Sequence, residues 1–191
     1  MNKKLRIAGI IAALAASAII LTSPSQSPPL PPPSQSQDES IQVLATGLKK
    51  PWAIAFSDDQ IFVTEKGGDI RVIQSGVLLD EPLATVRAAK IHGGGLLGIA
   101  THPDFVNNRF LYVYYTYSEG DVLWNKVLRI TESNNKIQDT FTIIDKIPAS
   151  QFYNGGVIKF GPDGKLYVAT GLSEEFSHES QNPESLEGKI L

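Results

Sequence analysis

The sequence predicts an all-β fold: a partial β-propeller of about three four-stranded blades, preceded by an apolar helix and a proline-rich linker. Three observations lead to this prediction. From residue 41 onward the chain consists of short β-type runs separated by turn residues. A strand–turn–strand unit recurs along it. No long stretch shows the 3.6-residue periodicity of an amphipathic helix.

The runs predicted as strands are rich in Val, Ile, Tyr and Phe, which favour pleated, half-buried positions. They cover residues 41–45, 52–56, 61–65, 70–74, 83–87, 97–101, 110–116, 126–130, 140–145, 157–160 and 166–170. Turn residues separate them, among them Gly67-Gly68 and Asn134-Asn135. This alternation is typical of antiparallel sheets joined by tight turns.

The repeated unit appears in residues 54–65, 98–113 and 158–170, each of which reads as strand, turn, strand. Phe56, Thr101 and Phe160 occupy equivalent places, 45 and 59 residues apart. The longer interval predicts an insertion around residues 118–123. An open β-sandwich with similar hairpins is the alternative. Because propellers close with four to eight blades, we expect a truncated sequence or a second chain that completes the ring.

The N-terminus carries a targeting signal. Lys3, Lys4 and Arg6 precede an uncharged apolar run over residues 7–22. Residues 1–22 are therefore predicted to be a secretory signal peptide or an uncleaved signal anchor. Small residues at 16–18 suit cleavage, whereas the apolar residues that follow suit an anchor. Either way, the folded part is expected outside the cytoplasm, secreted or held at a membrane.

Residues 23–40 form a linker in which six of the twelve prolines lie between Pro24 and Pro33. Proline fixes φ and lacks an N–H donor, so this stretch is expected to be extended and solvated. It is either a spacer from a membrane or wall or a disordered tail. Residues 41–191 are expected to form the folded domain.

Composition excludes several function classes. The chain has 17 basic and 20 acidic residues, so it has no basic field to hold nucleic acid. The absence of cysteine excludes disulfides, thiolate–metal sites and cysteine nucleophiles. His92, His102 and His178 show no metal-ligand spacing, so no metal site is predicted from them. Trp52 and Trp124 are expected to pack within blades.

An ordered set of motifs resembles the PQQ-dependent aldose sugar dehydrogenases, the glucose/sorbosone dehydrogenase family. The motifs are residues 47–52 and 63–72 for the first blade, 94–105, 111–116 and 125–129 for the second, and 154–167 and 186–191 for the third. The family fold is a six-bladed propeller, and this chain resembles its N-terminal half. The resemblance implies PQQ (pyrroloquinoline quinone) aided by calcium, oxidation of an aldose at its anomeric carbon, and an external electron acceptor.

The resemblance also suggests site residues. Tyr153 stands where the family has its catalytic histidine, just before Asn154-Gly155-Gly156. A phenol, with an ordinary pKa of about 10, is protonated at neutral pH, whereas an imidazole near 6.5 accepts a proton. His92, Gly93, Gly94 and Asn154 are the candidate substrate rim, and no cofactor-binding residue is assigned.

Two further positions depart from the family pattern. Gly93 stands where the family often has Gln or Glu, and Gly171-Leu172 stands where it usually has Gly-Asp. Together with Tyr153, these departures leave two hypotheses open. One is an exported, truncated quinoprotein-like dehydrogenase, active or catalytically impaired. The other is a non-catalytic propeller that serves as a binding module at the cell surface. A third possibility is an incomplete gene or assembly product with no function of its own.

Overall fold

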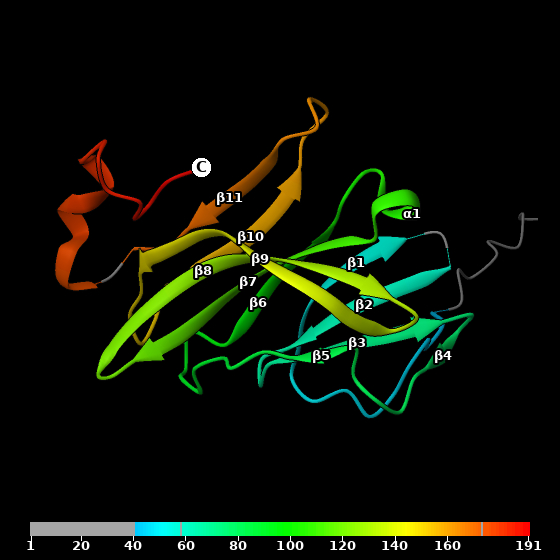
Figure 1. The fold of residues 1–191 in the computed structure, drawn as a ribbon. Helices are drawn as coiled ribbons and strands as arrows, with labels where there is room; N and C mark the ends of the chain where they lie inside the picture. Colours follow the sequence, from blue (N-terminus) through cyan, green and yellow to red (C-terminus); the bar gives the residue numbers. More distant parts are fainter. Residues whose placement is uncertain (1–40, 58, 173) are drawn as a thin grey trace, which may run out of the picture. The chain divides into compact units, whose positions relative to one another are not determined.

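The computed structural model describes residues 41–191, except Asp58 and Ser173. The expected apolar helix (1–22) and linker (23–40) lie outside the described residues. Within the described part, the chain forms antiparallel sheets that follow one another along the sequence (Figure 1). No helix in this part has the length and apolar character needed to cross a bilayer.

The first sheet has the order β1-β2-β3-β4, with β5 also paired to β3. Its strands are β1 (Pro51–Ser57), β2 (Gln60–Glu65), β3 (Asp69–Gln74), β4 (Val77–Leu78) and β5 (Ala84–Thr85). Tight turns join β1, β2 and β3, so the sheet is a meander. Gly68, with φ +118, sits in the turn between β2 and β3, where a side chain would be strained and would meet the carbonyl oxygen of Val86.

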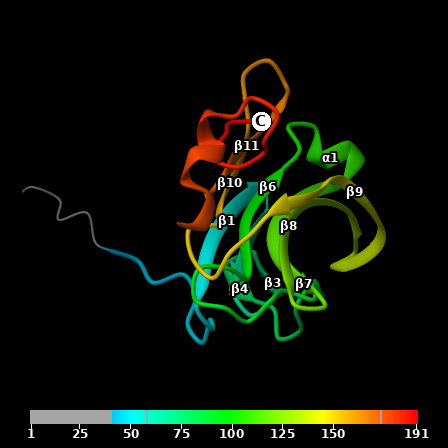
Figure 2. The same cartoon turned by 90° about the vertical axis from the view of Figure 1, so that its left-hand side faces the viewer.

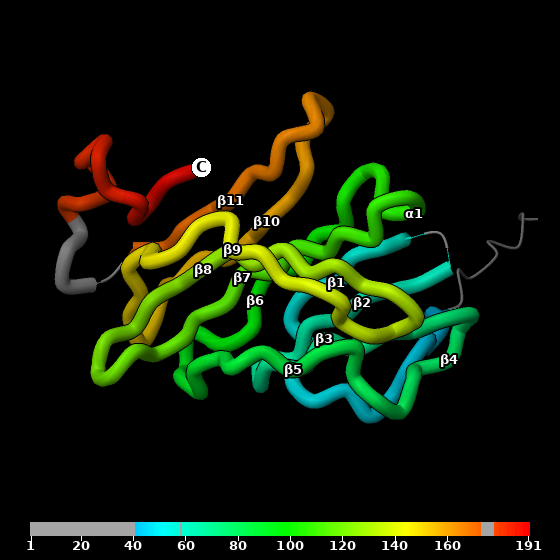
Figure 3. Tube along the Cα trace, in the orientation of Figure 1, coloured from blue at the N-terminus to red at the C-terminus, as the bar shows by residue number. Residues whose placement is uncertain are grey.

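The second sheet has the order β6-β7-β8-β9 and contains the longest strands. These are β6 (Leu96–Thr101), β7 (Phe110–Glu119), β8 (Val122–Ser133) and β9 (Lys136–Pro148), with the short helix α1 (Phe105–Asn108) between β6 and β7. The tube in Figure 3 follows the chain through these antiparallel strands, and Figure 2 shows β8 and β9 curving. The expected insertion at 118–123 is the tip of the long β7–β8 hairpin.

The third sheet consists of β10 (Gly155–Phe160) and β11 (Leu166–Thr170). Ile190, near the end of the sequence, forms an isolated bridge to Ala169. The 3-10 segment η1 (Glu174–Gln181) lies between them in sequence. The described chain therefore has two full blades and the inner strands of a third, in line with the predicted partial propeller.

The sheets pack face to face, and the second sheet is buried on both faces. The two faces of β6 belong to different cores, and the register shift between Leu96 and Ile99 places these two residues on the same face although they are three positions apart. Leu96 and Ile99 pack with Phe62 of the first sheet, whereas Leu97 and Ala100 belong to a second core shared with the third sheet. Burying apolar surface stabilises a fold by about 25 cal/mol per Å². The side chains of these two cores are therefore the main source of stability.

The first strands of the three sheets, β1, β6 and β10, lie side by side. Each strand shows a register shift near its start, at Pro51/Ile54, Leu96/Ile99 and Gly155/Val157 respectively. The Thr101 hydroxyl donates to the Phe56 carbonyl oxygen (2.8 Å), which ties the far ends of β6 and β1. The repeat assigned from the sequence is thus a structural repeat of inner hairpins.

Two strand predictions were wrong in extent. Residues 41–45 form no strand, and Val43 and Leu44 are exposed. The strand expected at 83–87 shrinks to Ala84–Thr85. In both places an apolar run lacks a long partner strand, and pairing decides strand length more than β-propensity does. The remaining predicted runs all lie in strands.

Candidate active site at the rim of the inner strands

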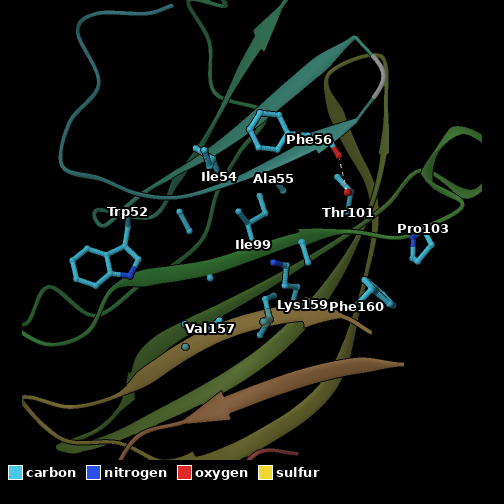
Figure 4. A pocket seen from close by; sticks show the side chains of 15 residues that line it. Trp52, Ile54, Ala55, Phe56, Ile99, Thr101, Pro103, Val157, Lys159 and Phe160 are labelled. Carbon is cyan, nitrogen blue, oxygen red and sulfur yellow. Dashed lines mark hydrogen bonds between the residues drawn. The ribbon is translucent and has the colours of Figure 1, made fainter. Parts of the chain in front are cut away.

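A cavity of about 650 Å³ runs along β1, β6 and β10 (Figure 4). Trp52 lies at one end and Pro103 at the other. Its wall is apolar, and Lys159 is the one charged residue that lines it among the described residues. An apolar wall can hold a ligand but offers no acid or base. The chemistry of this site must therefore come from an end of the cavity.

The three inner strands begin at the same end, which we call the rim: Trp52, Lys66, His92, Phe152 and Tyr153. Backbone bonds hold it together, since the Lys66 N–H donates to the Lys50 carbonyl (3.1 Å) and the Leu96 N–H to the Lys66 carbonyl (3.2 Å). These bonds fix the loops before β1 and β6 close to one another, and the loop before β10 is joined to them by the bond from the Gly93 N–H to the Gln151 carbonyl (2.7 Å). Positioning of functional groups by rigid strands is typical of binding sites.

Lys66 is the cation of the rim. Its ammonium donates to the His92 carbonyl oxygen (2.7 Å) and lies 4.6 Å from the centre of the Trp52 ring. These two contacts combine a charge-assisted hydrogen bond with a cation–π interaction, so they restrict a side chain that is otherwise mobile. Trp52 is 58% exposed, so it does not pack inside a blade as expected.

His92 is an exposed imidazole on this rim. Its ring lies 5.9 Å from that of Phe152, which in turn lies 6.2 Å from the ring of Tyr153. The His92 ring makes no hydrogen bond within the described part of the chain. Its nitrogens are therefore available to a ligand.

Gly93 and Gly94 hold the loop that carries His92. The Gly93 N–H donates to the Gln151 carbonyl (2.7 Å), and a Cβ on Gly93 would lie 2.4 Å from the Cα of Phe152. A Cβ on Gly94 would lie 2.8 Å from the hydroxyl oxygen of Thr116. The neighbours of Gly93 are backbone atoms of the loop before β10, so glycine there lets the loops of the second and third sheets meet, whereas the neighbours of Gly94 are side chains of Ile91 and Thr116.

Asn154 lies beneath the rim and is 3% exposed. Its amide nitrogen donates to the carbonyl oxygens of Gly93 (3.0 Å) and Ser150 (2.8 Å), and its amide oxygen accepts from the Ser150 N–H (3.0 Å) and the Asn125 amide (3.3 Å). All four bonding positions of the amide are used. The geometry gives Asn154 a positioning role, and its contact with substrate stays a prediction.

Tyr153 has a left-handed backbone (φ +58) and a side chain that is 65% exposed. Its carbonyl oxygen accepts from the Leu172 N–H (3.0 Å), which fixes the backbone although the ring projects into solvent. A non-glycine residue at positive φ is uncommon and carries strain. The phenol can thus reach a ligand at the rim, and its catalytic role stays a prediction.

The structure brings together His92, Gly93, Gly94, Tyr153 and Asn154, the five residues singled out from the sequence. The other histidines lie elsewhere: His102 at the opposite end of the inner strands, and His178 beside Glu179 near the C-terminus. Sequence reasoning missed Lys66 and Phe152. Lys66 could have been found from the Gly67-Gly68 turn, because this turn places Lys66 at the end of a strand.

Metal-ligating side chains do not gather in threes anywhere in residues 41–191 outside positions 58 and 173. The described rim offers aromatic rings, an ammonium and an imidazole. This set can bind a planar or anionic ligand and can transfer a proton.

Comparison with known proteins identifies the chain. Residues 48–191 match the family described as Glucose / Sorbosone dehydrogenase. The chain belongs to this family. It is 30% identical over 160 residues to the aldose sugar dehydrogenase YliI of Escherichia coli, covering 80% of the chain and 43% of that protein. The chain thus spans less than half the length of this relative.

Two solved structures agree with this assignment. A putative oxidoreductase (glucose dehydrogenase) of Thermus thermophilus is 37% identical, with a TM-score of 0.72, over 78% of this chain and 46% of that one. The PQQ-bound form of an aldose sugar dehydrogenase from Streptomyces coelicolor is 31% identical, with a TM-score of 0.70, over 79% of this chain and 46% of that one. The sheets described above follow the β-propeller of these proteins.

Proposed function

We propose that this chain supplies the sugar-facing part of a PQQ-dependent dehydrogenase that oxidises an aldose at its anomeric carbon. The observation that carries the proposal is the rim, where the loops before three inner strands place an imidazole, an ammonium and exposed aromatic rings together. Family membership and the PQQ-bound Streptomyces relative support it. An extracytoplasmic location, secreted or anchored by residues 1–22, and an external electron acceptor belong to the same proposal.

The rim residues fit one side of such a cofactor, which is a flat aromatic quinone bearing carboxylates. The exposed rings of Trp52, Phe152 and Tyr153 suit its plane, and the ammonium of Lys66 suits a carboxylate. These four residues would hold it. When bound, the quinone accepts the hydride released from the anomeric carbon. No calcium ligands are assigned, because the described residues offer no matching cluster.

His92 is the residue that takes the proton in this proposal. As the aldose is oxidised, the proton of the anomeric hydroxyl passes to a neutral imidazole nitrogen of His92, and the sugar leaves as a lactone. Tyr153, at the family's base position, acts as a hydrogen-bond donor to the sugar instead. Lys66 fixes the loop that carries His92 through the bond to its backbone carbonyl oxygen (2.7 Å). A well-placed general base contributes about 10²–10⁴ in rate.

The test is to supply the purified chain with PQQ and calcium and to follow dye reduction with a panel of neutral aldoses. PQQ binding is measured separately by quenching of Trp52 fluorescence, with Trp124→Phe used to isolate that signal. Binding together with aldose-dependent reduction supports the proposal. A folded chain that binds no PQQ overturns it.

A second candidate is a non-catalytic binding propeller, which is favoured by the phenol of Tyr153 in place of the expected histidine. The variant Tyr153→His separates the two candidates. If neither the wild type nor this variant reduces dye while both bind aldose, the binding module is supported. If the wild type is active and loses activity in His92→Asn, this second candidate fails.

A further inference from the structure

Beside the rim lies a second cavity, of about 430 Å³, whose lining includes Lys50, Lys66, Lys90 and His92. The volume falls in the range of small-molecule sites. No carboxylate is among its lining residues. The cavity therefore has a single sign of charge, which is uncommon for a surface in which acidic residues outnumber basic ones.

The three lysines reach this cavity from different parts of the chain. Lys50 directly precedes β1, Lys66 follows β2, and Lys90 lies in the loop before β6. The backbone of each region is fixed, since Lys66 N–H donates to the Lys50 carbonyl (3.1 Å) and Ala89 N–H to the Thr116 carbonyl (2.7 Å). Their convergence is thus a property of the fold rather than of one basic segment.

None of these three lysines takes part in an ion pair within the described part of the chain. Lys126, Lys146 and Lys165, in contrast, each pair with a carboxylate. Ammonium groups that share one cavity repel each other, and no carboxylate in the lining offsets that repulsion. A bound anion removes that repulsion and gains charge-assisted hydrogen bonds.

We infer that this cavity holds an anionic group, phosphate or carboxylate, carried by the aldose substrate. The inference rests on the proposed function for the identity of the aldose. The cavity shares Lys66, His92 and Gly94 with the rim region, whereas Trp52, Phe152 and Tyr153 do not line it. The rings and the shared Lys66 serve the cofactor, Lys50 and Lys90 take the anion, and the proton acceptor His92 lies at the boundary between the two sites.

The first test measures binding of inorganic phosphate alone, by calorimetry on the full chain. The variant is Lys50→Gln/Lys90→Gln, and the matched control is Lys136→Gln/Lys165→Gln, which removes the same charge from exposed lysines remote from the cavity. We expect at least a tenfold loss of phosphate affinity in the variant and less than a twofold change in the control. Equal losses in both, or phosphate binding unchanged in both, overturn the inference.

The second test compares substrates. The ratio of kcat/KM for glucose 6-phosphate, and separately for glucuronate, to that for glucose is measured in the same proteins. We expect each ratio to fall at least tenfold in Lys50→Gln/Lys90→Gln and to hold in the control. A variant that loses PQQ affinity instead, with both ratios unchanged, assigns the cavity to the cofactor and overturns the inference.

Failure of the inference and failure of the proposed function can be told apart. If dye reduction is absent for every sugar, the proposed function fails, and the phosphate arm alone decides whether the cavity is an anion site. If dye reduction is present and the lysine variant matches its control in both arms, the dehydrogenase stands and the anion site is rejected. Circular dichroism of each variant confirms that the comparison is between folded proteins.

Discussion

The two ends of the inner strands each carry a histidine, but the two environments differ. At the rim, His92 is exposed and its ring has no hydrogen-bond partner among the described residues. At the opposite end, the His102 ring lies 5.1 Å from that of Phe160 and 6.3 Å from that of Tyr112. Its Nδ1 also accepts from the Asp104 N–H (3.0 Å) and contacts the Asn108 amide nitrogen (2.8 Å).

The difference shows that one end of the inner strands uses its polar side chains for stability, whereas the other end leaves them free to contact a ligand. At the opposite end, polar groups are occupied by other protein groups, as with Glu132, which is 0% exposed and paired with Arg109. At the rim the backbone is equally well fixed, yet the side chains of His92 and Tyr153 remain uncommitted. Groups without protein partners are those that can bind and react. This contrast can be tested by matched substitutions at the two ends.

The largest expected effect is on catalysis at the rim. On the proposed function, His92→Asn removes the proposed proton acceptor, and kcat/KM for aldose oxidation should fall by about 10²–10⁴, with the melting temperature unchanged. The matched change at the other end, His102→Asn, should lower stability by about 1–2 kcal/mol through lost packing and hydrogen bonding, with kcat/KM unchanged. Steady-state kinetics and thermal melts on both variants check this, and a reversed pattern would contradict the comparison.

The next largest effect concerns the buried ion pair at the opposite end. Arg109→Met leaves the carboxylate of Glu132 buried without its cation, which should cost about 3 kcal/mol and lower the melting temperature by roughly 6–12 °C. Urea unfolding measures the change. The double variant Arg109→Met/Glu132→Gln removes the unpaired charge and should recover part of the loss. If the single variant is as stable as the wild type, the pair does not stabilise that end.

A smaller effect is expected where the rim loops meet. Gly93→Ala places a Cβ 2.4 Å from the Phe152 Cα, so the loop that carries His92 must shift. We expect a loss of about 2 kcal/mol and a lower kcat/KM. Gly67→Ala is the control, because a Cβ there meets nothing within 4 Å. Similar stability for both variants would show that the loops tolerate displacement.

The smallest effect is electrostatic and lies on the second sheet. Burial raises the pKa of Asp145, but the Tyr117 hydroxyl (2.5 Å), the Lys146 N–H (2.8 Å) and the Lys126 ammonium (3.3 Å) outweigh it and lower that pKa overall. A lowered pKa in the folded state adds stability above the unfolded pKa of about 3.9, and this is lost as pH falls through the folded value.

Asp145→Asn should therefore flatten the loss of stability below about pH 4. The difference from the wild type at neutral pH should stay below about 1 kcal/mol, because the pair is partly exposed. Thermal melts at pH 7, 5 and 3 provide the measurement. If the melting temperatures of the wild type and Asp145→Asn fall in parallel as the pH is lowered, Asp145 does not make the contribution to stability assigned to it.

Much of the fold could be predicted from the sequence, because alternating β-branched and aromatic runs determine which face of a strand is buried. The inner hairpins also carry a repeat signal, since Phe56, Thr101 and Phe160 occupy equivalent places and all line the cavity. The strand expected at 41–45 was wrong because Val43 and Leu44 have no partner strand. Strand length depends on pairing, and pairing is not visible in one strand's own residues.

The site was harder to predict. The family resemblance suggested Tyr153, and His92 was the histidine favoured for the rim. The rings of both lie near that of Phe152, and this proximity depends on how two loops meet, which local sequence does not encode. The side-chain amide of Asn154 makes all its hydrogen bonds to protein groups beneath the rim. An asparagine is usually exposed, so the residue type alone could not predict that this one is buried. Trp52 is exposed because β1 faces the cavity. Each of these points follows from tertiary contacts between separate sheets.

The register shifts near the starts of β1, β6 and β10 have a consequence for how such a propeller can change. Each bulge absorbs an irregular residue pair before regular pairing resumes at Ile54, Ile99 and Val157. A substitution before a bulge is therefore expected to leave the hydrogen-bonded strand pairing after the bulge unchanged. A residue such as Tyr153 can replace another type there without disturbing how the blades stack, so chemistry and architecture vary independently.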